Sequence, residues 1–156
     1  MKGQERVEAA LAEAGEPIAV VELARSARTA QLAADALGTA LGSIVKSLVF
    51  LADGRPVLVL VSGDRRVSPE KLKQLLRARR VMIADAHRVR EETGFSIGGV
   101  PPVGHQPPLP TFIDASLERF ETVYAAAGHH QAVFSVPFKT LVRVTNGTVA
   151  DLVESG

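Results

Sequence analysis

The sequence predicts an α/β (α+β) fold in which short helices flank one mixed β-sheet, and three observations lead to this prediction. The chain has 156 residues, of which 46% are hydrophobic, so residues 1–156 have the size and apolar content of a single domain. Runs of β-branched residues alternate with short amphipathic segments. Asp53-Gly54, a hairpin signal, joins two of these runs, which argues against a purely parallel sheet.

Helices are expected where apolar residues recur at a spacing of three or four between capping residues. Thr29, Ser68 and Asp85 are the expected N-caps of three helices, and Gly15, Gly38 and Gly94 are the expected ends of the first, second and fourth predicted helices. In chain order, helical segments are predicted at residues 7–14, 30–37, from residue 68 onward, and at residues 86–93, 115–120 and 137–146.

Strands are expected where β-branched and aromatic residues run together between turn residues. In chain order, they are predicted at residues 17–23, 42–52, 55–62, 81–84, 110–114, 122–128 and 132–136. The second and third of these strands form the hairpin around Asp53-Gly54.

Composition excludes several classes of site and location. The formal net charge is +1, so the overall charge of the chain does not indicate a nucleic-acid or membrane partner. The chain has no cysteine, which excludes disulfides, thiolate nucleophiles and zinc–thiolate sites. Residues 1–15 are charged and amphipathic, without the apolar core of a signal peptide, and no segment has the length of a membrane span. A cytoplasmic protein without a membrane partner is expected.

Lys46 is the first candidate for a functional side chain. In a strand it shares a face with Leu48 and Phe50, while Val45 and Val49 occupy the other face, so the strand is expected to be buried on both sides. A lysine in such a strand must extend to water, meet an anion or lose its proton at a lowered pKa. A strand-end lysine whose amine reaches solvent is the plainer interpretation.

The second candidate is the loop over residues 96–110, which holds three glycines and five prolines. Gly98 and Gly99 permit a close approach of the backbone, whereas Pro101 and Pro102 remove two N–H donors and leave carbonyl oxygens as the main polar groups. Such a loop suits recognition of an amine or hydroxyl donor. A rigid surface turn is the alternative, and nothing local decides between them.

Other catalytic signatures are missing from the sequence. The four histidines show no ligand spacing, and the adjacent pair His129-His130 would point to opposite faces of a strand, so no metal is expected. There is no Gly-x-Ser-x-Gly elbow and no glycine-rich nucleotide loop, so no serine triad and no cofactor are expected.

Basic residues concentrate between Asp64 and Arg90, where nine basic residues accompany three acidic ones. Lys73, Arg77 and Arg80 are predicted to form one helical stripe beside an apolar face. That face consists of Leu72, Leu75 and Leu76. The stripe is either a solvated helix face or a contact for the phosphate backbone of RNA.

Four segments together resemble a known family. "GSIVKSLVF", "TGFSIGGVPPVGH" with a Gly-x-x-x-Pro loop at residues 98–102, "PTFID" and "TVYAAAG" occur in the order and spacing of the YbaK/EbsC-like proteins. These are free-standing relatives of the editing domain of bacterial prolyl-tRNA synthetases, and the resemblance covers roughly residues 20–150.

The resemblance implies a curved mixed sheet and hydrolysis of mischarged aminoacyl-tRNA in trans, with tRNA(Pro) carrying alanine, cysteine or a similar small amino acid as substrate. It implies that Lys46 and Gly98 are catalytic and that a prolyl-tRNA synthetase is a candidate partner. The implied contacts to the substrate are Ser47, Gly99, Val100, Pro101, Pro102, Ala126 and Gly128. His129, next to Gly128, is either a further contact of the pocket or a surface-loop histidine. With this function, the basic residues Lys73, Arg77 and Arg80 are the expected contacts to the tRNA backbone.

One position departs from the family pattern and leaves the amino acid open. Relatives that deacylate cysteinyl-tRNA(Pro) carry a serine where this chain has Ala126. Two other classes of function also stay open: a non-catalytic binding module for aminoacyl-tRNA ends or a nucleotide-like ligand, and a hydrolase of small esters. Turnover separates an enzyme from a binding module, and salt dependence separates an RNA substrate from a small molecule.

Overall fold

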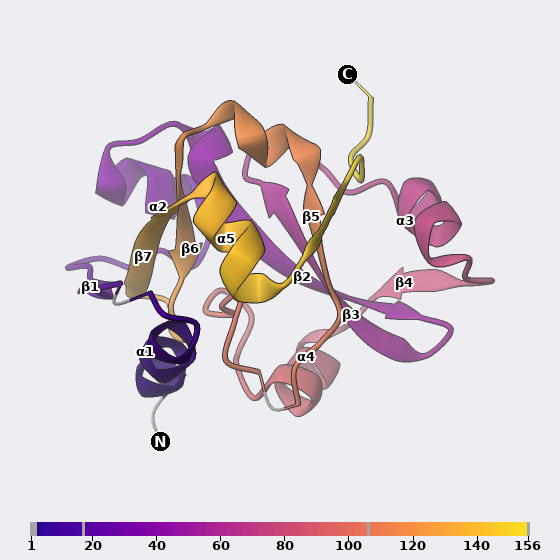
Figure 1. Ribbon diagram of the computed structural model, residues 1–156, viewed down its shortest axis with the longest axis horizontal. Coiled ribbons are helices and arrows are strands. Elements are labelled where there is room, and N and C mark those ends of the chain that lie inside the picture. The colour runs from indigo at the N-terminus through magenta and orange to yellow at the C-terminus, as the bar shows by residue number, and fades with distance from the viewer. Residues whose placement is uncertain (1–2, 17, 106, 156) are drawn as a thin grey trace.

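The computed structural model describes residues 3–16, 18–105 and 107–155. Within them, an 8-stranded mixed sheet has the order β1-β7-β6-β2-β3-β5-β8, with β4 also paired to β2, and helices pack around it (Figure 1). This arrangement confirms the predicted fold class. The helices are α1 (Gly3–Glu13), α2 (Ala30–Leu37), α3 (Pro69–Leu76), α4 (Ala86–Thr93) and α5 (Phe138–Thr145), with 3-10 turns at Leu41–Ser43 and Ala115–Arg119. The strands are β1 (Val21–Glu22), β2 (Ile44–Ala52), β3 (Arg55–Ser62), β4 (Val81–Ile83), β5 (Thr111–Asp114), β6 (Thr122–Ala126), β7 (Ala132–Pro137) and β8 (Thr148–Ala150).

The predicted hairpin is the centre of the sheet. Strands β2 and β3 pair in an antiparallel register from Val45 opposite Ser62 to Ala52 opposite Arg55. Asp53 and Gly54 both have positive φ, at 51° and 82°, as the two central residues of a type I′ hairpin turn require. The hairpin turn predicted at Asp53-Gly54 is therefore confirmed.

The other edge of β2 is shared by two strands that leave a gap between them. Strand β6 pairs in parallel with Ile44 and Val45 only, and β4 pairs antiparallel from Phe50 onward. Between these contacts, the described strands leave residues 46–49 without a ladder partner on this edge. The gap positions the candidate site.

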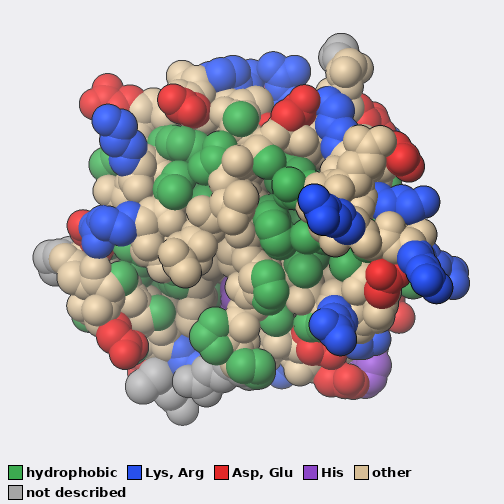
Figure 2. Space-filling view, turned by 45° about the vertical axis from the view of Figure 1, so that its right-hand side comes forward, with side chains coloured by type: hydrophobic (Ala, Val, Ile, Leu, Met, Phe, Trp, Pro, Cys, Tyr) green, Lys and Arg blue, Asp and Glu red, His purple; other side chains and the backbone are tan. Residues whose placement is uncertain are grey.

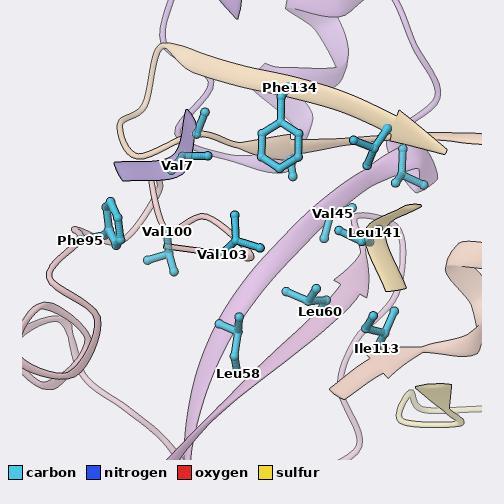
Figure 3. Close-up of a cluster of buried hydrophobic side chains, with 14 of the residues drawn as sticks. Val7, Val45, Leu58, Leu60, Phe95, Val100, Val103, Ile113, Phe134 and Leu141 are labelled. Carbon is cyan, nitrogen blue, oxygen red and sulfur yellow. The ribbon is translucent and has the colours of Figure 1, made fainter. Parts of the chain in front are cut away.

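The main hydrophobic core joins the sheet to the glycine- and proline-rich loop. Figure 3 shows Val45 and Leu60 from the sheet near Leu141 of α5, while Val100 of the loop lies between Phe95 and Val103 on the side toward Val7. Phe95 and Val103 of the same loop segment are also buried in this cluster. The loop is therefore part of the folded body and does not act as a flexible linker.

The capping predictions for three helices are confirmed. Thr29, Ser68 and Asp85 accept hydrogen bonds from the backbone N–H groups of Leu32, Lys71 and Arg88, respectively. Each bond satisfies one donor that the first turn of a helix leaves free. No described helix has the length and apolar character that a membrane crossing requires.

The predicted stripe on α3 is wrong. The helix ends at Leu76, and Arg77 takes the left-handed conformation at φ 53°, so Arg80 lies beyond the helix, before β4. Leu75 is 41% exposed and does not belong to the apolar face, because the short helix packs through Leu72 and Leu76 only.

Two strands also differ from expectation. The strand predicted at residues 17–23 is reduced to Val21–Glu22, with Pro17 outside the described residues. Strand β8 was not expected. It pairs in parallel with β5, from Thr148 opposite Phe112, so tertiary pairing creates a strand where the local pattern is too short to indicate one.

A matched pair of leucines tests the core. Leu60 is fully buried, so Leu60→Ala is expected to lower the free energy of unfolding by about 2–5 kcal/mol through lost burial and a residual cavity. The exposed Leu75→Ala should change it by no more than about 0.5 kcal/mol. Urea denaturation of both variants measures the difference, and equal midpoints would contradict this core assignment.

Candidate functional site

A cavity of about 360 Å³ lies at the gap in the sheet. Its walls come from α2, the open edge of β2, the end of β4, the β6–β7 turn and the loop around Gly98. Most lining side chains are small and apolar, among them Ala30, Ala33, Val49 and Ala125. A small, largely apolar chamber with few polar groups is typical of a ligand site.

The cavity brings together residues that are far apart in the sequence. Six of the predicted site residues line it: Lys46, Ser47, Gly98, Val100, Ala126 and His129. Gly99, Pro101, Pro102 and Gly128 do not line it, and Pro102 borders a separate cavity beside α1. Residues at the start of the glycine–proline loop, Gly98 and Val100, thus line the cavity, whereas Pro102 lies outside it.

Lys46 is held at the edge of the chamber by a backbone carbonyl. Its Nζ donates to the carbonyl oxygen of Arg65 at 2.6 Å. Burial lowers the pKa of Lys46, the nearby Arg66 lowers this pKa further, and Asp64 opposes both effects. The amine is therefore partly desolvated and close to a second cation, which favours a bound anion.

Substitution of the two charged neighbours should move the pKa of Lys46 in opposite directions. Asp64→Asn removes a negative charge that favours the ammonium form, so it should lower the pKa of Lys46. Arg66→Gln removes a positive charge and should raise it. NMR titration of the Lys46 side chain in both variants measures the shifts, and shifts of the same sign would contradict this arrangement.

The loop is fixed by its own backbone groups. The N–H of Gly99 donates to the carbonyl of Ser96 at 3.0 Å, and the carbonyl of Gly99 accepts from the N–H of Gly128 at 3.1 Å. Behind the loop, Nε2 of the buried His105 donates to the carbonyl of Pro101 at 2.7 Å. The carbonyls of Gly99 and Pro101 are therefore already engaged within the protein.

The absence of side chains at two glycines lets the loop pack closely. Gly98 has φ 91°, and a Cβ there would lie 2.5 Å from Cγ of Arg28. A Cβ on Gly99 would lie 2.7 Å from Cα of His129. The loop can approach Arg28 and the β6–β7 turn this closely only because Gly98 and Gly99, respectively, carry no side chain.

Two further polar side chains of the chamber differ in their bonding. The hydroxyl Oγ of Ser47 is buried and has no hydrogen-bond partner among the described residues. His129 lies in the β6–β7 turn, where its Nδ1 accepts from the N–H of Gln131 at 3.2 Å. Its Nε2 is 4.0 Å from the carboxylate of Glu22.

The basic residues proposed for RNA contacts do not line the cavity. Lys73, Arg77 and Arg80 belong to α3 and the segment that leads into β4, which lie beside each other in Figure 1. Figure 2 shows Lys and Arg side chains spread over the visible face with acidic side chains between them. Because α3 ends at Leu76 and Arg77 is left-handed, Lys73, Arg77 and Arg80 do not lie on one helical stripe.

Several lining residues could not be anticipated from local motifs. Arg28 and Thr29 border the cavity from the start of α2, and Ile83 and Ile97 are more than half exposed at its lining. Thr29 was recognisable as a helix cap, but no local signal directs these residues toward Lys46. Within the described part of the chain, no group of three or more potential metal ligands gathers at this site.

Comparisons with known proteins identify the family and a matching fold. A family model described as the aminoacyl-tRNA editing domain matches residues 24–144. A crystal structure described provisionally as a trans-editing enzyme for prolyl tRNA synthetase superposes with a TM-score of 0.93 at 44% identity, covering 99% of both chains.

Two curated relatives show similarity in sequence. The uncharacterized protein YwhH of Bacillus subtilis is 35% identical over 125 residues, which cover 78% of each chain. The proline--tRNA ligase of Bacillus licheniformis is 35% identical over 145 residues, which cover 90% of this chain and 25% of that ligase. The chain thus spans about a quarter of the ligase.

Proposed function

Because the chain belongs to the aminoacyl-tRNA editing domain family, we propose that it is an aminoacyl-tRNA deacylase that hydrolyses mischarged tRNA in trans. The family match confirms the resemblance that the sequence motifs indicate. We propose further that residues 1–156 act as one editing domain in the cytoplasm. The substrate in this proposal is the acceptor end of tRNA(Pro), with a prolyl-tRNA synthetase as the candidate protein partner.

One observation carries the proposal: Lys46 and Gly98, from two of the four segments that carry the resemblance, line the same small cavity. In the proposed complex, the ammonium of Lys46 binds the terminal phosphate or the ester oxygens of the tRNA end. The loop at Gly98 positions the attacking water. A partly desolvated cation beside Arg66 supports the anion-binding role.

The reaction needs no protein nucleophile. Water adds to the ester carbonyl carbon, the bond from that carbon to the ribose oxygen breaks, and the ribose oxygen takes a proton, which releases the amino acid. An aminoacyl ester is already activated, so positioning and electrostatic stabilisation supply most of the catalysis. The chamber is small and its lining, including Ala125, Ala126 and Ala132, is mostly apolar, which suits a small amino acid such as alanine or cysteine.

A deacylation panel tests this function. The purified protein is incubated with tRNA(Pro) charged separately with alanine, cysteine, serine or proline, and with alanyl- and threonyl-tRNA, and released amino acid is measured. Selective release of one small amino acid from tRNA(Pro) is the expected result. Tight binding without hydrolysis of any substrate would instead identify a binding module and refute the enzyme.

We propose that Lys73, Arg77 and Arg80, which lie outside the cavity, contact the phosphate backbone of the tRNA. Neutralising each residue to glutamine should weaken tRNA binding and reduce the slope of log affinity against log salt by about one per lost phosphate contact. Binding measured from low to moderate salt reports this slope. An unchanged slope in the triple variant would show that the phosphates lie elsewhere.

A further inference from the structure

The open edge of β2 directs the main chain of Ser47 into the cavity. In a strand, the N–H and C=O groups of one residue point to the same side, and those of the next residue point to the opposite side. The carbonyl of Ile44 accepts from the N–H of Gly63, beyond the end of β3, and the carbonyl of Val49 accepts from Ala84, beyond the end of β4. Ser47 has the parity of Val49, so its N–H and C=O point away from β3 into the gap.

This gap gives Ser47 a donor and an acceptor without a ladder partner among the described strands. Pairing with β6 ends at Val45, and pairing with β4 begins at Phe50. Ser47 lines the cavity, and most of its neighbours there are apolar. Backbone groups inside a folded protein are nearly always paired, so an open pair in an apolar chamber is suited to a polar ligand.

We propose that the Ser47 main chain binds the α-aminoacyl group of the substrate as if that group were a residue of a neighbouring strand. In an antiparallel ladder, two facing residues exchange two hydrogen bonds, each giving one N–H and accepting through one C=O. The aminoacyl group carries the matching set: an α-ammonium donor and an ester carbonyl acceptor on adjacent atoms of one unit. The ammonium donates to the carbonyl of Ser47, and the ester carbonyl accepts from the N–H of Ser47. This inference rests on the proposed deacylase function.

The arrangement divides recognition between two parts of the site. The main chain of Ser47 reads atoms that every α-aminoacyl ester shares, while the lining side chains select the amino acid by size. The N–H of Ser47 also meets the oxygen on which negative charge develops when water adds to the carbonyl carbon, so it stabilises the transition state. The side-chain hydroxyl of Ser47 takes no part in this contact, because a side chain leaves a strand roughly perpendicular to the sheet, here on the face of Val45 and Val49, whereas the N–H and C=O groups lie in the plane of the sheet.

Acyl groups that differ only at the α-position test the ammonium contact. Alanyl-, lactyl- and propionyl-tRNA(Pro) are compared, and each rate is divided by the uncatalysed rate of the same ester in the same buffer. Propionyl has no donor, so its acceleration should fall about 10- to 10²-fold below that of alanyl, with lactyl between them. Equal accelerations for alanyl and propionyl esters would overturn the inference.

Ser47→Ala separates the main chain from the hydroxyl. The variant keeps the N–H and C=O of residue 47 in place, so the ratio of alanyl to propionyl acceleration should stay within about threefold of the wild-type ratio. Loss of a hydrogen bond to the charged ammonium would change this ratio much more. If the preference for alanyl disappears in Ser47→Ala, the hydroxyl carries the recognition and the main-chain assignment is wrong.

NMR locates the contact without relying on turnover. In the ¹⁵N-labelled protein, 3′-alanylamido-adenosine, a non-hydrolysable analogue, should shift the Ser47 amide strongly downfield. Shifts at Gly98 with an unchanged Ser47 amide would overturn the inference. Equal hydrolysis of alanyl and propionyl esters retains the proposed function and removes this inference. Binding at Ser47 without hydrolysis of any aminoacyl-tRNA would refute the proposed function and retain the main-chain contact.

Discussion

Lys46→Ala is expected to reduce kcat/KM for deacylation about 10²- to 10³-fold, the usual effect of removing one group that stabilises transition-state charge. The amine lies at the cavity, is partly desolvated and has Arg66 nearby, so its contact with a phosphate or an ester oxygen is poorly replaced by water. Single-turnover hydrolysis of the substrate identified by the panel measures the effect.

A second lysine provides the control for this substitution. Lys139 is exposed on α5 and does not line the cavity, so Lys139→Ala removes the same charge and should leave kcat/KM unchanged. Thermal unfolding of both variants checks that the fold is retained. Nearly wild-type hydrolysis by a folded Lys46→Ala variant would remove Lys46 from the proposed mechanism.

Gly99→Ala is expected to reduce hydrolysis by about 10²-fold, although Gly99 itself does not line the cavity. A Cβ there would meet backbone atoms of His129 at 2.7 Å, 3.0 Å and 3.1 Å, and backbone cannot move aside as the end of a flexible side chain can. The loop must therefore shift away from the β6–β7 turn, which displaces Gly98 and Val100 from the cavity wall.

Gly54→Ala is the matched control for Gly99→Ala. Gly54 lies in the hairpin turn with φ 82°, and a Cβ there meets no atom within 4 Å. Its left-handed conformation should make alanine cost about 1–2 kcal/mol of stability without moving the loop. Below the unfolding temperature, Gly54→Ala should retain full hydrolysis. Equal activities of the Gly99→Ala and Gly54→Ala variants would refute the role of this close approach.

Local patterns predicted much of the fold because they act over a few residues. The caps at Thr29 and Asp85 and the turn at Asp53-Gly54 depend on neighbours in sequence, and all three are confirmed. The course of the chain after α3 and the strand β8 involve partners far along the chain. The N–H groups of Arg79 and Arg80 donate to the carboxylate of Asp53, and β8 pairs with β5, so local patterns did not indicate either feature.

Residue type alone made Lys46 and the loop around Gly98 candidates, because a lysine in a strand expected to be buried on both faces and a loop of glycines and prolines are both uncommon. Residue type did not decide between a functional and a structural role, and only the resemblance assigned them to a site. Ser47 was implied by the resemblance, but its open main chain follows from where β6 stops pairing and β4 starts. Sequence periodicity contains no information on that gap.

The gap also has a consequence for the order in which the molecule assembles. The β2–β3 hairpin closes a two-residue turn and should form within about 1–10 μs, whereas β6 must bring Ala125 back to Val45 from a distant part of the chain. Pairings of such long range are slow, with folding times of milliseconds to seconds in sheet-rich proteins. We therefore expect time-resolved hydrogen exchange to protect the hairpin first. The cavity should form later, when β6 pairs with β2. Before that step, Lys46 would already lie in its strand, but there would be no pocket to bind a substrate.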